Sequence, residues 1–169
     1  FTAMFSQIID HPNITCRLNT EFRSIEDKLS YQKLIYTGPV DAFFDYKFGK
    51  LPYRSLDFEF KTLDEERFQE EAVVNYPNHH DYTRITEFKQ FYFQENSKTT
   101  ICYEFPKGEG DPFYPVPRKE NQELYQKYKQ LADNQDNVYF LGRLAEYKYI
   151  NMDLAVDKAL SLVEKLEDF

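Results

Sequence analysis

Four short segments between residues 54 and 105 alternate apolar and polar side chains, and this block constrains the fold more than any other part of the sequence. Turns that are polar or rich in proline and asparagine separate the segments, which are Arg54–Phe60, Ala72–Tyr76, Tyr82–Phe88 and Thr99–Phe105. Alternation with a period of two places one face of a strand against a core and the other in solvent. The block therefore predicts an antiparallel sheet in which Leu56, Phe58 and Phe60 point inward.

A helical pattern and two short apolar segments precede this block. Thr2–Asp10 carries apolar side chains at helical spacing, and His11 should end the helix because a residue before proline disfavours helical backbone angles. Asn13–Asn19 alternates apolar and polar side chains, and Lys33–Thr37 is an apolar run that ends at a Gly-Pro turn. We predict a helix followed by two strands, which is an order typical of an α/β layer.

After the block, the pattern returns to helix, strand and helix. Apolar side chains repeat at helical spacing from Lys119, Val138–Leu141 is a short apolar run, and Leu154–Leu166 is amphipathic, with Asn151 or Asp153 as its cap. The sequence therefore predicts a mixed α/β fold into which an antiparallel sheet is inserted. Its five glycines form no Gly-x-Gly-x-x-Gly fingerprint, so we expect the α/β domain to begin outside this chain.

Charge and composition narrow the possible partners of these 169 residues. The formal net charge is -8, which repels nucleic acid and anionic membranes. No apolar stretch approaches the roughly 20 residues of a membrane helix, and no signal peptide is visible at the start. We expect a soluble, cytoplasmic protein that binds neither nucleic acid nor membrane.

The cysteines and the paired histidines do not predict a metal site. Cys16 and Cys102 each lie in an apolar alternating run, where a cysteine usually acts as a small buried side chain. His79 and His80 are adjacent, so on a strand their rings would point to opposite faces. We predict neither a disulfide nor a bound metal.

The segment between the last strand and the last helix, residues 142–153, is the first candidate for ligand binding. The start of a helix offers free N–H groups and a positive dipole end to an anionic or electron-rich ligand. Arg143 and neighbouring tyrosines add hydrogen-bond donors. The alternative is a capped helix with an exposed polar lead-in.

Two further segments carry candidate residues. Arg84 shares one face of its predicted strand with Tyr82 and Thr86, so its guanidinium either grips a phosphate or is a solvated or ion-paired surface group. Tyr114 lies in a proline-fixed segment that either holds its ring over a ligand or acts only as a stiff connector. Gly38 ends a strand in a turn where backbone can approach a cofactor closely.

In chain order, these segments resemble the UDP-galactopyranose mutase family. The similarity covers essentially the whole chain, and its motifs are Tyr36–Asp41, Tyr53–Leu56, Ala72–Tyr76, Tyr82–Glu87, Tyr114-Pro115 and Gly142–Asp153. The resemblance implies that residues 1–50 and 119–169 are parts of a Rossmann-like FAD-binding domain and that the twisted antiparallel sheet, residues 51–118, binds substrate. The chain would then be the carboxy-terminal part of the enzyme, without its flavin fingerprint and inactive alone.

The resemblance also implies an activity. Members of this family are isomerases (intramolecular transferases) that interconvert UDP-galactopyranose and UDP-galactofuranose for cell-surface polysaccharide biosynthesis. The reaction uses reduced FAD, whose N5 forms an adduct with the sugar, so the cofactor carries the difficult chemistry. The full-length protein would be a homodimer in many cases. Two alternatives stay open, namely another flavoenzyme of the amine-oxidase type and a noncatalytic sugar or protein interaction module.

Site residues follow from the resemblance, position by position. Arg84 and Arg143 are expected to be catalytic, and the expected substrate contacts are Asn75, Arg84, Tyr114 and Tyr149. The expected cofactor contacts are Phe22, Gly38, Gly142, Arg143, Asn151, Met152 and Asp153. Asn151 departs from the family pattern, which has aspartate at this position, so one negative charge near the diphosphate and flavin is lost.

Overall fold

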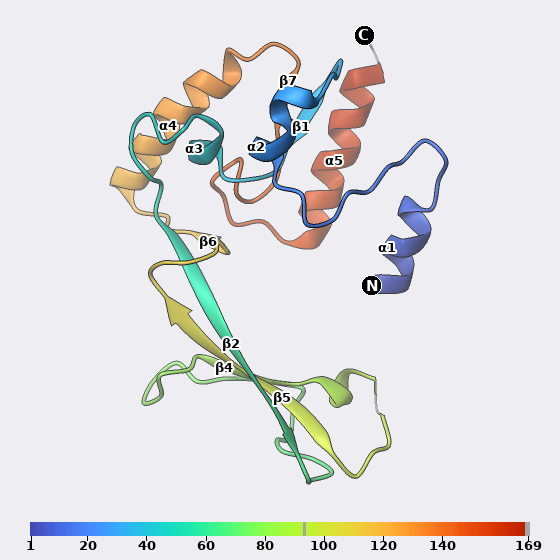
Figure 1. Cartoon of the computed structure of the whole chain (residues 1–169). Helices are drawn as coiled ribbons and strands as arrows, with labels where there is room; N and C mark the ends of the chain where they lie inside the picture. The colour runs from blue at the N-terminus through green and yellow to red at the C-terminus, as the bar shows by residue number, and fades with distance from the viewer. Residues whose placement is uncertain (93, 168–169) are drawn as a thin grey trace. The chain divides into compact units, whose positions relative to one another are not determined.

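The computed structural model describes residues 1–92 and 94–167 (Figure 1). The chain divides into two compact units, which are residues 1–32 and the remainder from residue 33 onward. No helix in the described part of the chain is both long and apolar enough to cross a membrane.

The first unit consists of short helices joined by exposed loop. Helix α1 spans Thr2–Ile9, as predicted, and α2 (Phe22–Ile25) leads into a 3-10 turn, η1 (Glu26–Lys28). The strand predicted over Asn13–Asn19 is wrong, because this segment is irregular and its Cys16 is exposed rather than buried. Alternation alone does not make a strand when no neighbouring strand supplies hydrogen bonds.

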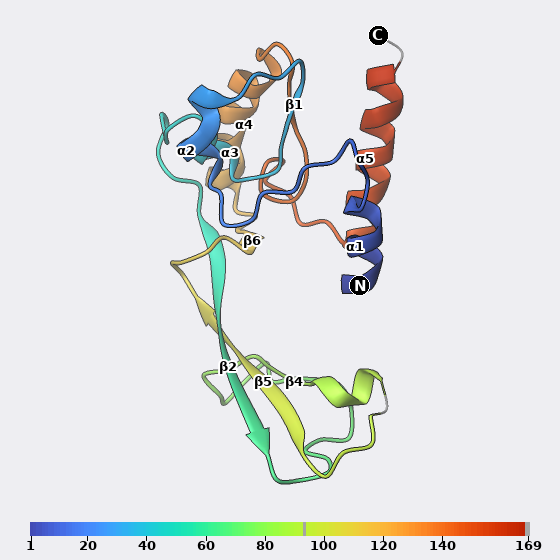
Figure 2. The ribbon, with the colours of Figure 1, turned by 45° about the vertical axis from the view of Figure 1, so that its right-hand side comes forward.

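The second unit contains a parallel pair of strands with three helices. Strand β1 (Leu34–Tyr36) pairs in parallel with β7 (Val138–Phe140), so segments about a hundred residues apart in sequence lie side by side. The helices are α3 (Val40–Phe43), α4 (Lys119–Asp133) and α5 (Met152–Glu167) (Figures 1 and 2). The predicted positions of α4 and β7 are confirmed, and α5 begins two residues before the predicted Leu154.

Tyrosines build the core of this α/β part. Val40, Leu51, Tyr128 and Tyr147 form a buried cluster. The Tyr128 hydroxyl accepts the Phe48 N–H at 2.9 Å and donates to the Gly49 carbonyl at 2.7 Å. Buried tyrosines are stable when the hydroxyl finds such partners, so these rings fill the core and also fix the backbone next to β2.

The antiparallel sheet contains five strands in the order β3-β4-β5-β2-β6. They are β2 (Tyr53–Leu63), β3 (Val73–Asn75), β4 (Arg84–Glu87), β5 (Thr99–Lys107) and β6 (Tyr114–Pro115). The four predicted strands are confirmed, whereas β6 was expected only as an extended segment. The short β6 pairs with Tyr53 and Arg54, the first residues of β2, so Tyr114 lies at the edge of the sheet.

The two faces of the sheet differ in burial. Ile85, Glu87 and Ile101 lie on the buried face, whereas Phe58 and Phe60 on the other face are 44 % and 63 % exposed. The prediction that Phe58 and Phe60 point inward is therefore wrong. A period of two shows which side chains share a face, but it does not show which face the rest of the chain covers.

Glu87 is the polar anchor of the buried face and is 0 % exposed. Its carboxylate accepts N–H groups of Phe68 and Gln69, each at 3.0 Å, the Thr99 hydroxyl at 2.6 Å, and the Gln90 amide. Burial alone would raise the pKa of Glu87, but these hydrogen bonds outweigh burial and hold the pKa below its ordinary value. A single carboxylate thus fixes the loop that covers the sheet.

The mixed α/β architecture with an antiparallel sheet is confirmed. A Rossmann-like FAD domain stays a prediction, as do the boundaries at residues 1–50, 51–118 and 119–169. The parallel sheet in the described part of the chain consists of β1 and β7.

We predict that Glu87→Gln lowers the free energy of unfolding by about 2 kcal/mol, because an amide leaves buried N–H donors without an acceptor. The pKa of Glu87 is lower in the folded than in the unfolded protein, so its contribution is complete above the ordinary value of 4.5 and is lost as pH falls below it. Urea unfolding at pH 7 and pH 3 measures both effects. Glu70→Gln, at an exposed neighbouring glutamate, is the matched control. Equal stability of the two variants at pH 7 would contradict the prediction.

Candidate functional site

Arg143, Tyr114 and Tyr149 form a cluster from separate parts of the chain. The Arg143 guanidinium carbon lies 5.1 Å from the centre of the Tyr114 ring and 4.7 Å from that of Tyr149. The two rings are stacked, with centroids 5.8 Å apart. Arginine on aromatic faces gains cation–π attraction, so the structure brings together three of the predicted site residues.

Backbone carbonyl groups orient the Arg143 guanidinium. Its Nη2 donates to the Ile150 carbonyl at 2.8 Å, and its Nη1 is 3.4 Å from the Phe113 carbonyl. The first bond closes the loop between β7 and α5, and the second joins this loop to the segment that carries Tyr114. Because carbonyl groups rather than carboxylates hold it, Arg143 keeps its full positive charge available to an anion.

Gly142 and Glu146 shape the start of this loop. Gly142 has φ of 97°, a conformation that glycine adopts without strain. Its N–H donates to Glu146 Oε2 at 2.9 Å, and Glu146 Oε1 accepts the Lys158 ammonium of α5 at 2.6 Å. An ion pair therefore ties the loop to the helix that follows it.

The buried Tyr147 and the half-buried Tyr53 fasten the same loop to the base of the sheet. Tyr147 donates to the Pro52 carbonyl at 2.6 Å and accepts the Val116 N–H at 3.3 Å, whereas Tyr53 donates to the Leu144 carbonyl at 3.2 Å. Burial raises the pKa of both hydroxyls. Ionisation of either hydroxyl is therefore disfavoured, which preserves both donors.

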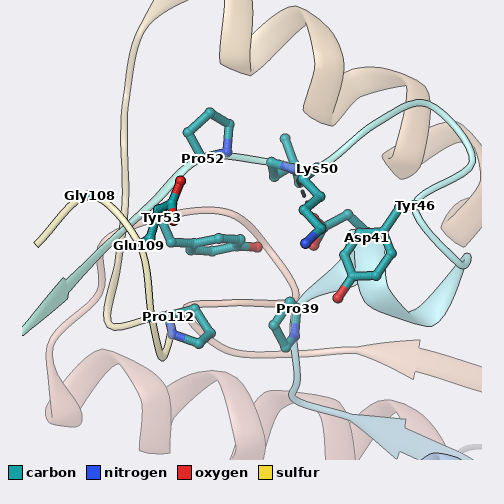
Figure 3. A pocket seen from close by; sticks show the side chains of 11 residues that line it. Pro39, Asp41, Tyr46, Lys50, Pro52, Tyr53, Gly108, Glu109 and Pro112 are labelled. Carbon is teal, nitrogen blue, oxygen red and sulfur yellow. Dashed lines mark hydrogen bonds between the residues drawn. The ribbon is translucent and has the colours of Figure 1, made fainter.

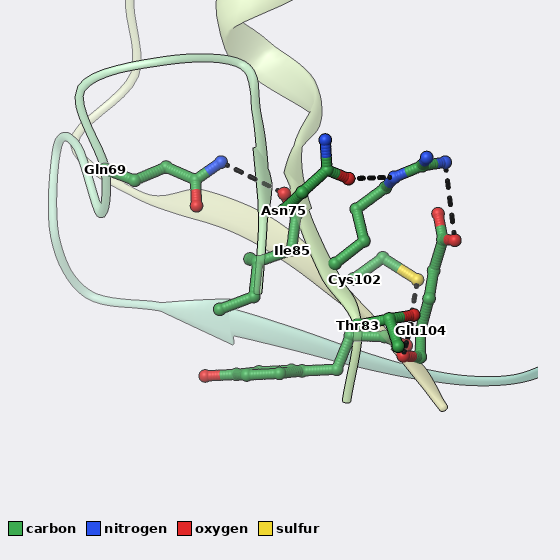
Figure 4. Close-up of polar contacts among 8 residues, drawn as sticks. Gln69, Asn75, Thr83, Ile85, Cys102 and Glu104 are labelled. Carbon is green, nitrogen blue, oxygen red and sulfur yellow. Dashed lines mark hydrogen bonds and ion pairs between the residues drawn. The ribbon is translucent and has the colours of Figure 1, made fainter. Parts of the chain in front are cut away.

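Arg84 and Asn75 form a second cluster on the open face of the sheet. Arg84 Nε donates to Asn75 Oδ1 at 3.0 Å, and Arg84 Nη1 lies 3.5 Å from the Glu104 carboxylate. Figure 4 shows the side chains of Asn75 and Glu104 in this part of the sheet. The Arg84 side chain is 41 % exposed. Two of the predicted substrate contacts, Arg84 and Asn75, are therefore in contact with each other, and part of the guanidinium remains accessible.

The start of α5 is also open to solvent. Asn151, Met152 and Asp153 are exposed, and the helix begins at Met152. The Asn151 carbonyl accepts the Ala155 N–H at 3.0 Å, which is the first bond of the helix. The N–H groups of the first turn therefore point toward an accessible surface, where a helix of 16 residues favours negative charge.

The two remaining predicted residues are Gly38 and Phe22. Gly38 is next to the Tyr36 ring, and a side-chain carbon there would lie 2.6 Å from the Tyr36 hydroxyl. The neighbour that requires glycine at position 38 is therefore Tyr36, two residues earlier in the chain. Phe22 lies in α2 of the first unit and is half-buried. Across the described residues, no hydrogen bond, ion pair or ring contact links the Arg84 cluster to the Arg143 cluster.

Sequence reasoning missed the residues that hold the site residues in place. Glu104 faces Arg84 across β4 and β5, and Glu146 holds the Gly142 N–H. The register between strands decides the first contact and a loop conformation the second, and neither is visible in one sequence. The only available signal for Glu104 is its polar character in a strand that also carries buried apolar residues.

Comparison with known proteins places the chain in a family. A family model described as UDP-galactopyranose mutase matches residues 1–149. A probable UDP-galactopyranose mutase of Klebsiella pneumoniae is 39 % identical, over 98 % of this chain and 44 % of that protein. The UDP-galactopyranose mutase of Mycoplasma pneumoniae is 36 % identical, over 98 % and 46 %, and the dTDP-fucopyranose mutase of Escherichia coli is 33 % identical, over 97 % and 46 %.

The chain therefore spans less than half the length of these relatives. The family match covers most of its residues, including the strands that carry Arg84 and Asn75 and the loop that carries Arg143. On this evidence the chain belongs to the UDP-galactopyranose mutase family.

Proposed function

We propose that the protein containing this chain is an isomerase that interconverts UDP-galactopyranose and UDP-galactofuranose with reduced FAD. The observation that carries the proposal is the cluster of Arg143, Tyr114 and Tyr149, whose members come from two segments far apart in sequence. A cation beside two phenol hydroxyls suits a diphosphate, because charge-assisted hydrogen bonds to phosphate oxygens are the strong ones.

In this proposal, the diphosphate of the nucleotide sugar binds to the Arg143 cluster. Tyr149 is exposed and Tyr114 half-buried, so both hydroxyls can reach a ligand. Arg143 is already held by the Ile150 carbonyl, and little side-chain freedom would be lost on binding. A donor array fixed before the substrate arrives lowers the cost of binding and orients the sugar for reaction.

Arg84 would stabilise the negative charge that grows as the bond between sugar and UDP breaks. Asn75 and Glu104 hold its Nε and Nη1 from two neighbouring strands, so the side chain has a defined direction on the sheet. Such a preorganised cation acts most strongly in the transition state, when the leaving group gains charge. Asn75 would complete the contact to the nucleotide sugar.

The residues around the Arg143 loop fit a flavin. Gly142 leaves open space, since a side-chain carbon there would meet nothing within 4 Å, and the exposed first turn of α5 presents N–H groups nearby in sequence. Gly142, Arg143 and the residues Asn151–Asp153 would hold the cofactor, with Phe22 and Gly38 as further contacts from the resemblance. When bound and reduced, the flavin supplies the nucleophile for the anomeric carbon of the sugar.

A dTDP-fucose substrate is a second candidate, because one relative is a dTDP-fucopyranose mutase. The Arg143 cluster would bind the diphosphate of either nucleotide sugar. Turnover of both substrates by the chemically reduced full-length protein separates the two. If the dTDP-fucose substrate were converted faster, it would take the place of UDP-galactose in the proposal. The proposed contact between Arg143 and the diphosphate would not change.

We predict that the isolated 169-residue chain does not retain flavin. The glycine-rich turn that cradles the pyrophosphate is normally a main source of affinity for the cofactor, and this chain lacks its fingerprint. Visible absorbance of the purified chain, after incubation with FAD and gel filtration, measures retention, with the full-length protein as control. A yellow chain with stoichiometric flavin would show that the remaining contacts suffice.

We predict that Asn151→Asp changes turnover of the full-length enzyme only modestly, because the two side chains have equal size and both accept hydrogen bonds. The added charge lies near an anionic ligand and so can weaken binding. Steady-state kinetics measures the effect, and Asn96→Asp at an exposed loop position is the control. A loss beyond about a hundredfold, or 2.7 kcal/mol, would mean that a neutral residue is required.

We predict that Arg84→Ala lowers turnover of the full-length enzyme by at least about a hundredfold, while thermal stability and flavin content stay nearly unchanged. Arg84→Lys should restore only part of the activity, because an ammonium cannot reproduce the planar guanidinium. The assay is conversion of UDP-galactofuranose by chemically reduced enzyme, together with a thermal melt.

Arg118→Ala, at an exposed arginine before α4, is the matched control and should keep normal turnover. Arg84 would instead be a surface or structural residue if its alanine variant kept more than about a third of the activity, a change of about 0.7 kcal/mol. The same conclusion would follow if activity were lost only through unfolding.

A further inference from the structure

Glu146 connects the loop that carries Arg143 to helix α5. Its Oε2 accepts the Gly142 N–H at 2.9 Å, and its Oε1 lies 2.6 Å from the Lys158 ammonium. Lys158 follows Met152, the first residue of α5, by roughly 9 Å along the helix axis. One carboxylate therefore joins the beginning of the loop to the second turn of the helix that follows it.

Hydrogen bonds close the turn between Gly142 and Glu146 from both ends. The Gly142 N–H donates to the Glu146 carboxylate, and the Glu146 N–H donates to the Gly142 carbonyl at 2.9 Å. Arg143 is the first residue inside this turn, and its own carbonyl accepts the Lys148 N–H at 3.1 Å. The turn therefore fixes the backbone from which the Arg143 side chain extends.

The far end of the Arg143 side chain is held next to the start of α5. Its Nη2 donates to the Ile150 carbonyl at 2.8 Å, and Ile150 lies just before Met152, where the helix begins. The guanidinium keeps its direction only if the two backbone segments that hold it keep the same separation. The ion pair between Glu146 and Lys158 spans these two segments.

This ion pair is largely shielded from solvent. The side chains of Lys158 and Glu146 are 29 % and 22 % exposed, whereas those of the Lys129–Asp133 pair in α4 are 46 % and 61 % exposed. Water and salt screen an exposed pair more strongly than a shielded one. Burial raises the pKa of Tyr125 in α4 to about 12, and the Glu146 charge acts in the same direction. The Glu146 carboxylate therefore acts in a shielded environment beside α4 and α5.

Other side chains hold the loop to the sheet rather than to α5. Tyr147 donates to the Pro52 carbonyl, and Tyr53 donates to the Leu144 carbonyl. Figure 3 shows the Tyr53 ring, which also lines a pocket of about 570 Å³ beside the first residues of β2. Because the tyrosines and the ion pair act on different neighbours of the loop, we expect the sheet contacts to survive when the ion pair is broken.

We propose that the Glu146–Lys158 ion pair positions Arg143 for the diphosphate of the nucleotide sugar. Glu146 and Lys158 act through Arg143 and do not touch the ligand, so both are positioning residues. The inference rests on the proposed diphosphate role of Arg143. A cation that is fixed in advance binds more tightly than a mobile one, because less side-chain freedom is lost on binding.

The test measures the Kd of UDP for the full-length protein by isothermal titration calorimetry, with uridine as the probe that lacks phosphate. Glu146→Gln removes the charge alone, because its amide oxygen can still accept the Gly142 N–H. Glu146→Gln and Lys158→Met should each weaken UDP binding by about fivefold, or about 1 kcal/mol, and leave uridine binding unchanged. Lys158→Arg keeps the positive charge and should stay within about twofold of normal UDP binding. Lys129→Met, which breaks the exposed pair in α4, is the matched control and should bind UDP normally.

A double variant shows whether the ion pair acts through Arg143. In an Arg143→Ala background, Glu146→Gln should have no further effect on UDP binding, because the group that the pair positions is gone. A thermal melt of each variant shows that it is folded at the temperature of the titration. An ion pair that only stabilises the fold would lower the melting temperature and leave the Kd of UDP unchanged.

Two results would overturn this inference alone. The first is normal UDP binding by Glu146→Gln when Arg143→Ala binds UDP weakly. The second is an effect of Glu146→Gln that is equally large with and without Arg143. Normal UDP binding by Arg143→Ala would contradict the proposed diphosphate role as well. If Lys158→Met does not fold, Glu146→Gln still decides the question, because glutamine has nearly the same shape as glutamate.

Discussion

The hydroxyl of Tyr147 is the point on which the geometry of the site depends. It donates to the Pro52 carbonyl and accepts the Val116 N–H, so one buried group joins the loop after β7 to the start of β2 and the end of β6. In the opposite direction, the hydroxyl of Tyr53 in β2 donates to the Leu144 carbonyl in the loop after β7. These bonds add to the contact of Arg143 with the Phe113 carbonyl and help to hold Arg143 beside Tyr114.

Much of the fold was predictable because its periodic signals are strong. The strands β2 to β5 and the helices α4 and α5 were found from alternation and helical spacing. The face that Arg84 shares with Thr86 followed from the same alternation, whereas the position of Asn75 opposite Arg84 is known only from the strand register of the structure. These inferences hold because strand geometry fixes the direction of successive side chains whatever their surroundings.

Other features depend on contacts that no short window of sequence contains. Glu87 accepts N–H groups from residues 68 and 69 and holds that loop on one face of the sheet, whereas Phe58 and Phe60 on the other face are exposed against expectation. The Arg143 cluster depends on the left-handed backbone of Tyr147, with φ of 45°, in the loop before α5. A tyrosine adopts that conformation only when surrounding contacts compensate for it.

The long strand β2 connects the loop that carries Arg143 to the sheet that carries Arg84. Its 11 residues run without interruption from Tyr53 to Leu63, a span of roughly 36 Å at about 3.3 Å per residue. Tyr53 donates to the Leu144 carbonyl in the loop that carries Arg143, while residues 55–63 of the strand pair with β5, which in turn pairs with β4 and Arg84. Arg84 pairs with Glu104, which pairs with Phe58, so Arg84 lies five residues, or roughly 17 Å, along the sheet from Tyr53. A tilt of a few degrees at the Tyr53 end would therefore shift Arg84 by about 1 Å.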